Sequence, residues 1–233
     1  MKPIMNKNST IPTTNGQSSL SFLHRPAASE VAAPWLLVLM HGVGSNEQDL
    51  FGLADYVPPQ FHVVSLRGPF ALGPGSHAWF QFSVARDGSR TIDSAQEAAS
   101  RAAIAQTVEA LAERFDVPTS RVVLGGFSQG GIMALSLLRT QPALQQAAMV
   151  MHSRLLPEVD ALAAPAEALQ GKQLWVSHGL QDGVIPLANA QAIRALAATW
   201  PVTLTYTEFP GAHEIRPAEL QAAMAWLQEL TAD

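Results

Sequence analysis

The chain of 233 residues contains no cysteine, and this absence removes several chemistries at once. Without thiols the protein has no disulfide framework, no cysteine nucleophile and no Cys-ligated zinc site. Charged residues are also few and make up 14% of the sequence. The formal net charge is -5, and lysine and arginine form no cluster. Phosphate backbones are neutralised by clustered cations, so this composition argues against nucleic acid as a partner.

Long hydrophobic runs are missing as well. The longest run, residues 35–40 (WLLVLM), is too short to span a bilayer and is typical of a buried strand. The first 14 residues contain no apolar stretch of signal-peptide length, so a cytoplasmic location without a membrane span is expected. No paired histidine–carboxylate motif such as H-E-x-x-H occurs. We therefore expect neither a metal nor another cofactor.

Two zones of different composition divide the chain. Residues 1–18 are rich in Asn, Ser, Thr and Pro without hydrophobic periodicity, which predicts a mobile leader. From residue 19 to 233 short apolar runs alternate with helical patterns, which predicts a single α/β domain with a mostly parallel central sheet and helices on both faces. Strands are expected at 20–25, 35–40, 61–66, 121–127, 146–151, 173–178 and 203–208.

The clearest helical pattern begins at Ser94. Ser94 and Glu97 have the spacing of a capping box, and Pro118 marks the exit from the helix. Between them apolar residues recur at helical intervals, namely Ile104, Val108, Leu111 and Phe115. Further helices are expected at 129–140, 188–199 and 217–230.

The strongest chemical signal lies at residues 126–130, whose sequence GFSQG matches the pattern G-x-S-x-G. An apolar strand pattern precedes it and a helix pattern follows, which is the context of the nucleophile elbow in α/β-hydrolases. A sharp turn there lifts the side chain of Ser128 clear of the backbone, and side chains at Gly126 or Gly130 would collide with the strand or the helix. A plain strand-to-helix turn is the alternative. The context favours Ser128 as a nucleophile at a helix N-terminus, whose dipole favours developing negative charge.

A serine hydroxyl needs a base to remove its proton, and the base needs an acid that holds its tautomer. In α/β-hydrolases the acid and then the histidine follow the serine along the chain. Asp182 follows the strand predicted at 173–178, and His213 follows the last predicted strand. Loops at the carboxyl ends of parallel strands meet where ligands bind. An ordinary Asp-Gly turn and a solvated histidine are the alternatives, but the order of Ser128, Asp182 and His213 predicts a catalytic triad.

The other histidines fit this order poorly. His24, His41, His62 and His77 precede the serine in the chain. His152 and His178 follow it, but they leave little room for an acid between strands. His213 is therefore the predicted base.

Residues 41–44 (HGVG) follow the strand predicted at 35–40. Glycine in this loop lets backbone N–H groups turn towards the reacting carbon. The amides of Val43 and of Gln129, the residue after the nucleophile, are the expected donors of an oxyanion hole. His41 is expected to orient the loop. Farther along, an aromatic loop places Trp79 and Phe80 either in an acyl pocket or as anchors in the core.

These residues resemble the bacterial carboxylesterase/phospholipase family that includes the acyl-protein thioesterases. The resemblance runs from about residue 35 to 228 and rests on blocks at 41–44, 46–50, 67–69, 79–80, 125–131, 178–186 and 211–215. It implies an α/β-hydrolase fold and a metal-independent esterase for short- to medium-chain acyl esters or thioesters. Family members are often dimeric, so the resemblance also implies a homodimer.

The chain departs from the family at residues 153–157. The family usually reads Ser-Gly-aromatic-Leu-Pro, whereas this chain reads SRLLP, with Arg154 in place of the glycine. Arg154 and Leu155 are expected close to the nucleophile, on the pocket side of the sheet. The guanidinium either points to water or pairs with Glu158, or it borders the pocket and favours substrates that carry a carboxylate or a phosphate.

The predicted function is a serine carboxylic-ester hydrolase that cleaves small-molecule acyl esters through an acyl-enzyme. Thioester cleavage from acylated proteins and lysophospholipid hydrolysis would use the same triad, and the sequence does not separate these substrates. A non-catalytic binding module of the same fold is an alternative from a different class. That alternative predicts the loss of a triad residue, and all three are present.

Overall fold

The computed structural model describes residues 6–9, 20–86 and 89–232. Among these residues eight strands form one sheet in the order β1-β2-β4-β3-β9-β10-β11-β12. β1–β2 and β2–β4 are antiparallel pairs, and the pairs that follow in this order are parallel. The strands are β1 (Asn6–Ser9), β2 (Phe22–Arg25), β3 (Trp35–Met40), β4 (Phe61–Leu66), β9 (Val122–Phe127), β10 (Ala147–Met151), β11 (Gln173–Gly179) and β12 (Thr203–Phe209).

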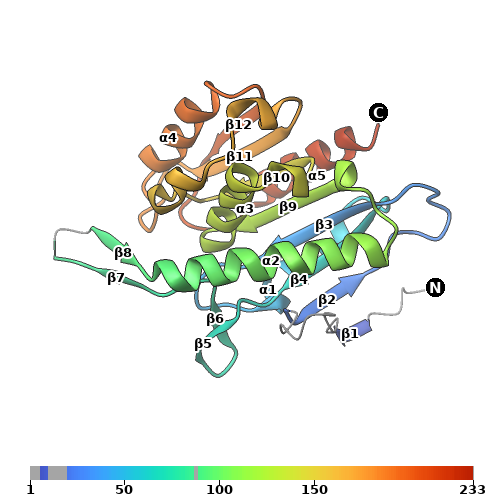
Figure 1. Ribbon diagram of the computed structural model, residues 1–233, viewed down its shortest axis with the longest axis horizontal. Coiled ribbons are helices and arrows are strands. Elements are labelled where there is room, and N and C mark those ends of the chain that lie inside the picture. The colour runs from blue at the N-terminus through green and yellow to red at the C-terminus, as the bar shows by residue number, and fades with distance from the viewer. Residues whose placement is uncertain (1–5, 10–19, 87–88, 233) are drawn as a thin grey trace.

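Helices cover both faces of this sheet (Figure 1). One face packs against α2 (Ser94–Arg114), α3 (Gln129–Thr140) and α4 (Ala188–Ala197), and the other against α1 (Glu47–Phe51) and α5 (Pro217–Leu230). The predicted mostly parallel sheet with helices on both faces is therefore confirmed. Short 3-10 segments lie at Ala54–Tyr56, Thr119–Arg121, Pro142–Leu144, Pro157–Leu162 and Ala166–Leu169.

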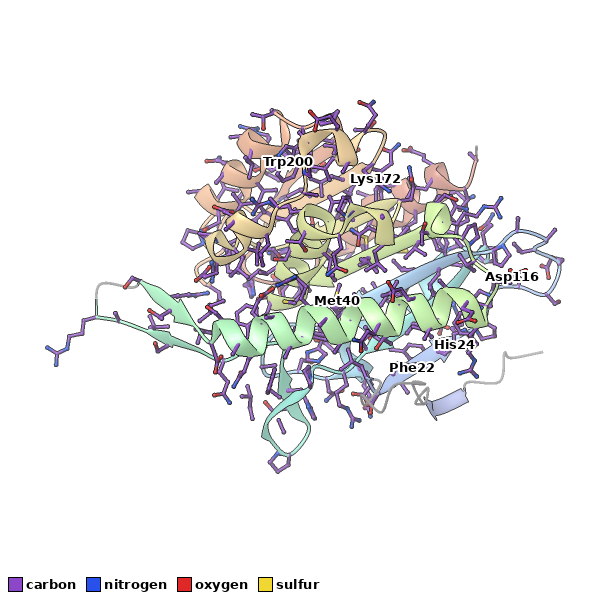
Figure 2. The ribbon with its side chains drawn as sticks, in the orientation of Figure 1. Phe22, His24, Met40, Asp116, Lys172 and Trp200 are labelled. Carbon is purple, nitrogen blue, oxygen red and sulfur yellow. The ribbon has the colours of Figure 1, made fainter. Side chains whose placement is uncertain are left out.

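The central strands show why their sequences are apolar on successive residues. Along β3, Val38 and Met40 pack on the side of α2 and α3, whereas Leu37 and Leu39 pack on the side of α1 and α5. Met40, labelled in Figure 2, is 0% exposed. A strand covered on both faces has no polar side to show, which is the pattern of a buried parallel sheet.

The seven strands and four helices expected from the sequence are all present, with ends that differ by at most two residues. The proposed capping box of α2 is wrong, because the N-cap is Asp93, whose side chain accepts the Gln96 amide at 3.0 Å. Glu97 instead forms an ion pair with Arg101 one turn later. An aspartate one residue earlier is an equally good cap and meets the same backbone donors.

Other elements were not expected. Asn6–Ser9, inside the predicted leader, pairs with β2 as β1, and the rest of that leader lies outside the described residues. The helix α1 and two hairpins were also missed: β5 (Phe70–Gly73) with β6 (Ser76–Ala78), and β7 (Phe82–Val84) with β8 (Arg90–Ile92). In the described part of the chain no helix has the length and hydropathy that a membrane crossing requires.

The elbow glycines hold α3 tightly against the sheet. A Cβ added at Gly130 would lie 1.9 Å from the carbonyl oxygen of Met40 in β3, and one at Gly126 would lie 2.3 Å from the carbonyl carbon of Gly130. The predicted collisions with helix and strand are thus present at both positions. Only hydrogen fits there, because backbone atoms cannot move aside as a flexible side chain would.

We expect Gly130→Ala to lower the free energy of unfolding by about 3 kcal/mol or more, since overpacking against well-packed groups costs ~1–3 kcal/mol and here the obstacle is backbone. Urea unfolding followed by circular dichroism measures the change. Gly73→Ala is the matched control, because a Cβ there meets nothing within 4 Å. Equal stability of the two variants would contradict this account of the elbow.

Candidate active site

Ser128 occupies the turn between β9 and α3. Its φ of 55° and ψ of -118° lie in a region that side chains rarely adopt, so the turn is strained. The turn is held from both sides, since the Ser128 amide donates to the Met151 carbonyl at 2.9 Å and the Ser128 carbonyl accepts the Ile132 amide at 3.1 Å. The surrounding structure therefore fixes a conformation that the residue alone would avoid.

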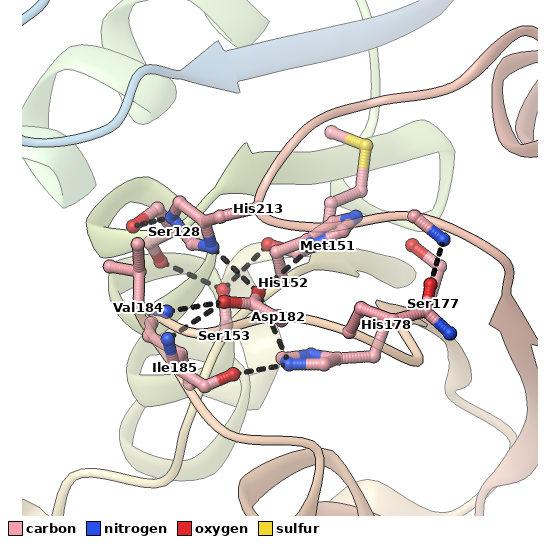
Figure 3. Close-up of polar contacts among 12 residues, drawn as sticks. Ser128, Met151, His152, Ser153, Ser177, His178, Asp182, Val184, Ile185 and His213 are labelled. Carbon is pink, nitrogen blue, oxygen red and sulfur yellow. Dashed lines mark hydrogen bonds and ion pairs between the residues drawn. The ribbon is translucent and has the colours of Figure 1, made fainter.

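The structure brings the three predicted triad residues together (Figure 3). His213 Nε2 lies 2.9 Å from Ser128 Oγ, and His213 Nδ1 lies 2.7 Å from Asp182 Oδ2. Both distances are within hydrogen-bond reach. With a proton on Nδ1 the imidazole donates to the carboxylate, and its bare Nε2 accepts from the serine hydroxyl. This is the geometry by which a base activates a serine nucleophile.

The carboxylate of Asp182 is fully buried, with a side-chain exposure of 0%. Its Oδ1 accepts the amides of Val184 and Ile185, each at 2.9 Å, while Oδ2 accepts from His213 and from His152 at 3.1 Å. Burial alone would raise the pKa of Asp182, but these hydrogen bonds outweigh it and lower the pKa below its ordinary value. The acid is thus held in its ionised form.

A second buried carboxylate lies on the far side of His152. His152 Nδ1 faces Asp182 at 3.1 Å, and its Nε2 lies 3.1 Å from Oε2 of Glu219 in the first turn of α5. Glu219 Oε1 accepts the hydroxyl of Ser177. Because both ring nitrogens face carboxylate oxygens, these surroundings favour the imidazolium form, in which both nitrogens carry protons and donate. Burial would lower the pKa of His152, but Glu219 and Asp182 outweigh it and raise the pKa above its ordinary value.

His178 stacks on His152 at 5.2 Å between ring centroids and has a different state. Its Nε2 lies 2.7 Å from the Ile185 carbonyl, so this nitrogen carries a proton and donates. Burial lowers the pKa of His178, against smaller opposing effects of Ile185 and Asp182. His178 is therefore a neutral ring that supports the loop after Asp182.

One group of side chains among the described residues could hold a metal ion by its spacing. It consists of His152, His178 and Asp182, whose ligand atoms lie within 4.8 Å of one another. The nitrogens of His152 and His178 that face this point are donors in the hydrogen bonds above. A proton and a metal compete for the same lone pair, so this network is built around protons.

Sequence reasoning missed His152 and Glu219 as parts of the site. The parallel register pairs Met151 with Phe127 on one side and with Ser177 on the other. The residue after Met151 therefore lies at the same edge as the nucleophile and the acid. The position of His152 directly after a predicted strand could therefore have indicated its place in the site. No local sequence pattern indicates Glu219, which lies 67 residues farther along the chain.

The two predicted oxyanion donors flank the nucleophile. A Cβ added at Gly42 would lie 3.3 Å from Ser128 Cβ, so the loop that carries Val43 lies against the serine. In the described residues no backbone carbonyl accepts the Val43 amide. Gln129 is the first residue of α3, where an amide has no acceptor in its own helix. Both donors are thus available to a ligand.

The structure places Trp79 and Phe80 in the core, with exposures of 0% and 1%. Gln129 ties this loop to the elbow, because its side chain accepts the Trp79 amide at 2.8 Å and donates to the Phe80 carbonyl at 2.6 Å. Trp79 Nε1 also donates to the His41 carbonyl at 2.9 Å. The contacts support the anchoring function rather than a pocket lining, since neither ring has surface to offer a substrate.

His41 orients its loop, as expected. Its Nε2 accepts the amide of Gly68 at 3.0 Å and its Nδ1 lies 2.7 Å from the Gly42 carbonyl.

Arg154 stands at the position where the family usually has glycine. It is half-buried, and its Nη1 donates to the Leu155 carbonyl at 3.0 Å. Leu155 packs against the cluster beneath α3 and α4. In the part of the chain that the structure describes, Arg154 forms no ion pair with Glu158.

A parallel sheet covered on both faces, with a serine elbow at its carboxyl edge, defines the class of α/β-hydrolases. Within that class the chain belongs to the phospholipase/carboxylesterase family, whose model matches residues 27–231. The esterase YpfH of Escherichia coli K12 is 30% identical over 202 residues, which are 84% of this chain and 83% of that protein. The family found from the sequence motifs is therefore confirmed, and the chain is a carboxylesterase-type hydrolase.

Solved structures agree on the fold. A Bacillus cereus carboxylesterase superposes with a TM-score of 0.76 at 22% identity and covers 91% of this chain and 94% of that one. A Mesorhizobium loti carboxylesterase gives a TM-score of 0.77 at 20% identity, with 94% and 98% covered.

We expect Asp182→Asn to lower kcat by up to ~10⁴-fold, the loss seen when a serine protease triad acid is changed in this way. The amide keeps the shape but donates where the carboxylate accepted, which favours the wrong tautomer of His213. Steady-state hydrolysis of a p-nitrophenyl ester measures the effect, with the exposed Asp55→Asn as control. Turnover within about tenfold of wild type would point to another acid, with Glu208 and Glu214 the first to test.

We expect Glu219→Gln to destabilise the fold by about 3 kcal/mol near pH 6, the lower end of the cost of removing one partner of a buried pair, because the His152 cation keeps only Asp182 as a carboxylate partner. The raised pKa of His152 gives stability that is present below its ordinary value of 6.5 and lost as the pH rises through the folded value. The difference between wild type and variant therefore shrinks as the pH rises.

Urea unfolding between pH 6 and 9 measures this difference, with the exposed Glu229→Gln on the same helix as control. A gap between wild type and Glu219→Gln that stays constant, or widens with pH, would show that His152 is not an imidazolium.

Proposed function

We propose that this protein is a serine carboxylic-ester hydrolase that cleaves short- to medium-chain acyl esters through an acyl-enzyme at Ser128. The observation that carries the proposal is the continuous chain of hydrogen bonds from Ser128 Oγ to His213 at 2.9 Å and on to Asp182 at 2.7 Å. Apart from Ser89, no other serine between residues 20 and 232 has an imidazole nitrogen as hydrogen-bond partner. The family membership and the esterase relative support the same reaction.

In the first half-reaction Ser128 Oγ attacks the ester carbonyl carbon while its proton passes to His213 Nε2. The carbonyl oxygen becomes an oxyanion between the amides of Val43 and Gln129. When the intermediate collapses, the bond to the leaving alcohol breaks and His213 returns the proton to that oxygen. The product is an acyl ester of Ser128 and a free alcohol.

In the second half-reaction water takes the place of the serine. His213 removes a proton from the water, the hydroxide oxygen adds to the acyl carbon and the same amides hold the oxyanion. Collapse releases the carboxylic acid and returns the proton to Ser128. Asp182 stays ionised throughout, because four hydrogen-bond donors around it favour the carboxylate.

The same steps would cleave a thioester or a lysophospholipid, since only the leaving group differs. We favour oxygen esters because the curated relative with 30% identity is named an esterase. The substrate is then a small-molecule ester, and no cofactor takes part in the proposed steps.

We expect a fluorophosphonate to label Ser128 and no other serine, because the Ser128 hydroxyl combines an imidazole base at 2.9 Å with oxyanion donors beside it. Intact-protein mass spectrometry followed by peptide mapping locates the label. Ser128→Ala should abolish both labelling and ester hydrolysis, whereas Ser94→Ala, at an exposed helix start, should leave both unchanged. A label on another serine, with Ser128→Ala still active, would falsify the assignment.

A further inference from the structure

A pocket of about 540 Å³ opens beside the acid of the triad. One wall comes from the β7–β8 hairpin, with Val84 and Arg90, and another from Arg154. The segment 183–186, directly after Asp182, forms a third wall. The residues that line it do not include Ser128, Asp182, His213 or either oxyanion donor.

Two arginines face this pocket, and neither has an anionic partner in the described part of the chain. Arg90 Nη2 donates to the Val184 carbonyl at 2.8 Å, and its guanidinium lies 5.3 Å above the ring of Phe82. Arg154 Nη1 donates to the Leu155 carbonyl, while its Nε is buried without a partner. Neutral carbonyls satisfy part of each guanidinium, and among the described carboxylates none lies within ion-pair distance of either charge.

These two charges act on one another. Burial lowers the pKa of Arg154, the exposed Glu158 opposes this and the positive charge of Arg90 lowers the pKa further. Like charges that share a partly buried space repel each other, and an anion placed between them relieves the repulsion. A planar guanidinium matches the geometry of a carboxylate or a phosphate with two parallel hydrogen bonds.

The pocket walls are also the segments that hold the triad. The amides of Val184 and Ile185 bind Asp182 at 2.9 Å. Arg154 follows Ser153, whose hydroxyl donates to the Ser128 carbonyl at 2.7 Å. Figure 3 shows Ser153, Val184 and Ile185 grouped around the triad. A ligand bound in the pocket is thus held by the same loops that position the nucleophile and the acid.

We propose that this pocket is a subsite for an anionic group of the substrate, a carboxylate or a phosphate bound by Arg90 and Arg154. The proposal rests on the esterase function and narrows it to esters that carry a second, negatively charged group. The apolar side chain of Val84, which is 58% exposed, would pack against the carbon chain that links the ester to this anion. Arg154 stands where the family usually has glycine and supplies a positive charge at that position.

The test uses two matched pairs of substrates. One pair is the p-nitrophenyl monoester of glutaric acid and the p-nitrophenyl ester of pentanoic acid, and the other is 1-butyrylglycerol 3-phosphate and 1-butyrylglycerol. The pairs separate a carboxylate on the acyl chain from a phosphate on the alcohol. For wild type we expect kcat/KM to favour the anionic member of one pair by about ten- to hundredfold, the range that charge-assisted hydrogen bonds give.

Arg154→Gln and Arg90→Gln should each bring this ratio close to one. In the wild type 0.5 M salt should lower the ratio, because the screening length falls from ~10 Å at 0.1 M to ~4 Å. Arg86→Gln is the matched control, because it removes the same charge from an exposed site on the β7–β8 turn that does not line the pocket. It should leave the ratio unchanged. If Arg154→Gln fails to fold, Arg90→Gln on the surface hairpin gives the same readout.

The proposal is overturned if wild type prefers neither anionic substrate, or if the pocket variants keep the ratio of Arg86→Gln. A failure of the esterase function is distinguishable, since Ser128 would then remain unlabelled and the neutral esters uncleaved. In that event calorimetric titration of glutarate into the protein tests the anion subsite independently of catalysis. Binding that Arg154→Gln abolishes supports the subsite, and absence of binding to wild type overturns it.

Discussion

The site depends on one buried negative charge, the carboxylate of Asp182. A carboxylate without water is stable only when hydrogen bonds satisfy its oxygens, and here they come from the amides of its own loop and from His152 and His213. These donors follow three neighbouring strands, β10, β11 and β12. The carboxylate therefore joins the strand ends into one rigid edge, and the strained Ser128 is held on the next strand, β9.

The charges of this edge also suit the reaction. With His152 as an imidazolium between the carboxylates of Asp182 and Glu219, the buried cluster has one negative charge in excess at rest. When His213 takes the serine proton, the cluster gains the positive charge that balances it. The protein thus places its excess charge where the transition state develops the opposite one, which is electrostatic preorganisation. Glu219 balances the positive charge of His152, so that the negative charge of Asp182 remains available to stabilise the His213 cation.

Local sequence patterns predicted the parts of the fold that local physics determines. The run WLLVLM is apolar at each position because β3 is covered on both faces, and the glycines around Ser128 report contacts with Met40 and with the start of α3. The link from His152 to Glu219 has no local signature, because α5 meets β10 only after the chain has folded. Sequence patterns did not reveal Arg90 either, because it reaches the distant Val184 carbonyl from the β7–β8 hairpin, nor the pairing of β1 with β2.

The most direct test of this account is the proton count on the histidine nitrogens, measured by ¹⁵N-histidine NMR near pH 7 and assigned with His152→Gln and His213→Gln variants. We predict protons on both nitrogens of His152 and a strongly downfield Nδ1 proton on His213, since each of these nitrogens faces a carboxylate at 2.7–3.1 Å. A bare nitrogen on His152, or a His213 ring with its proton on Nε2 alone, would contradict the account.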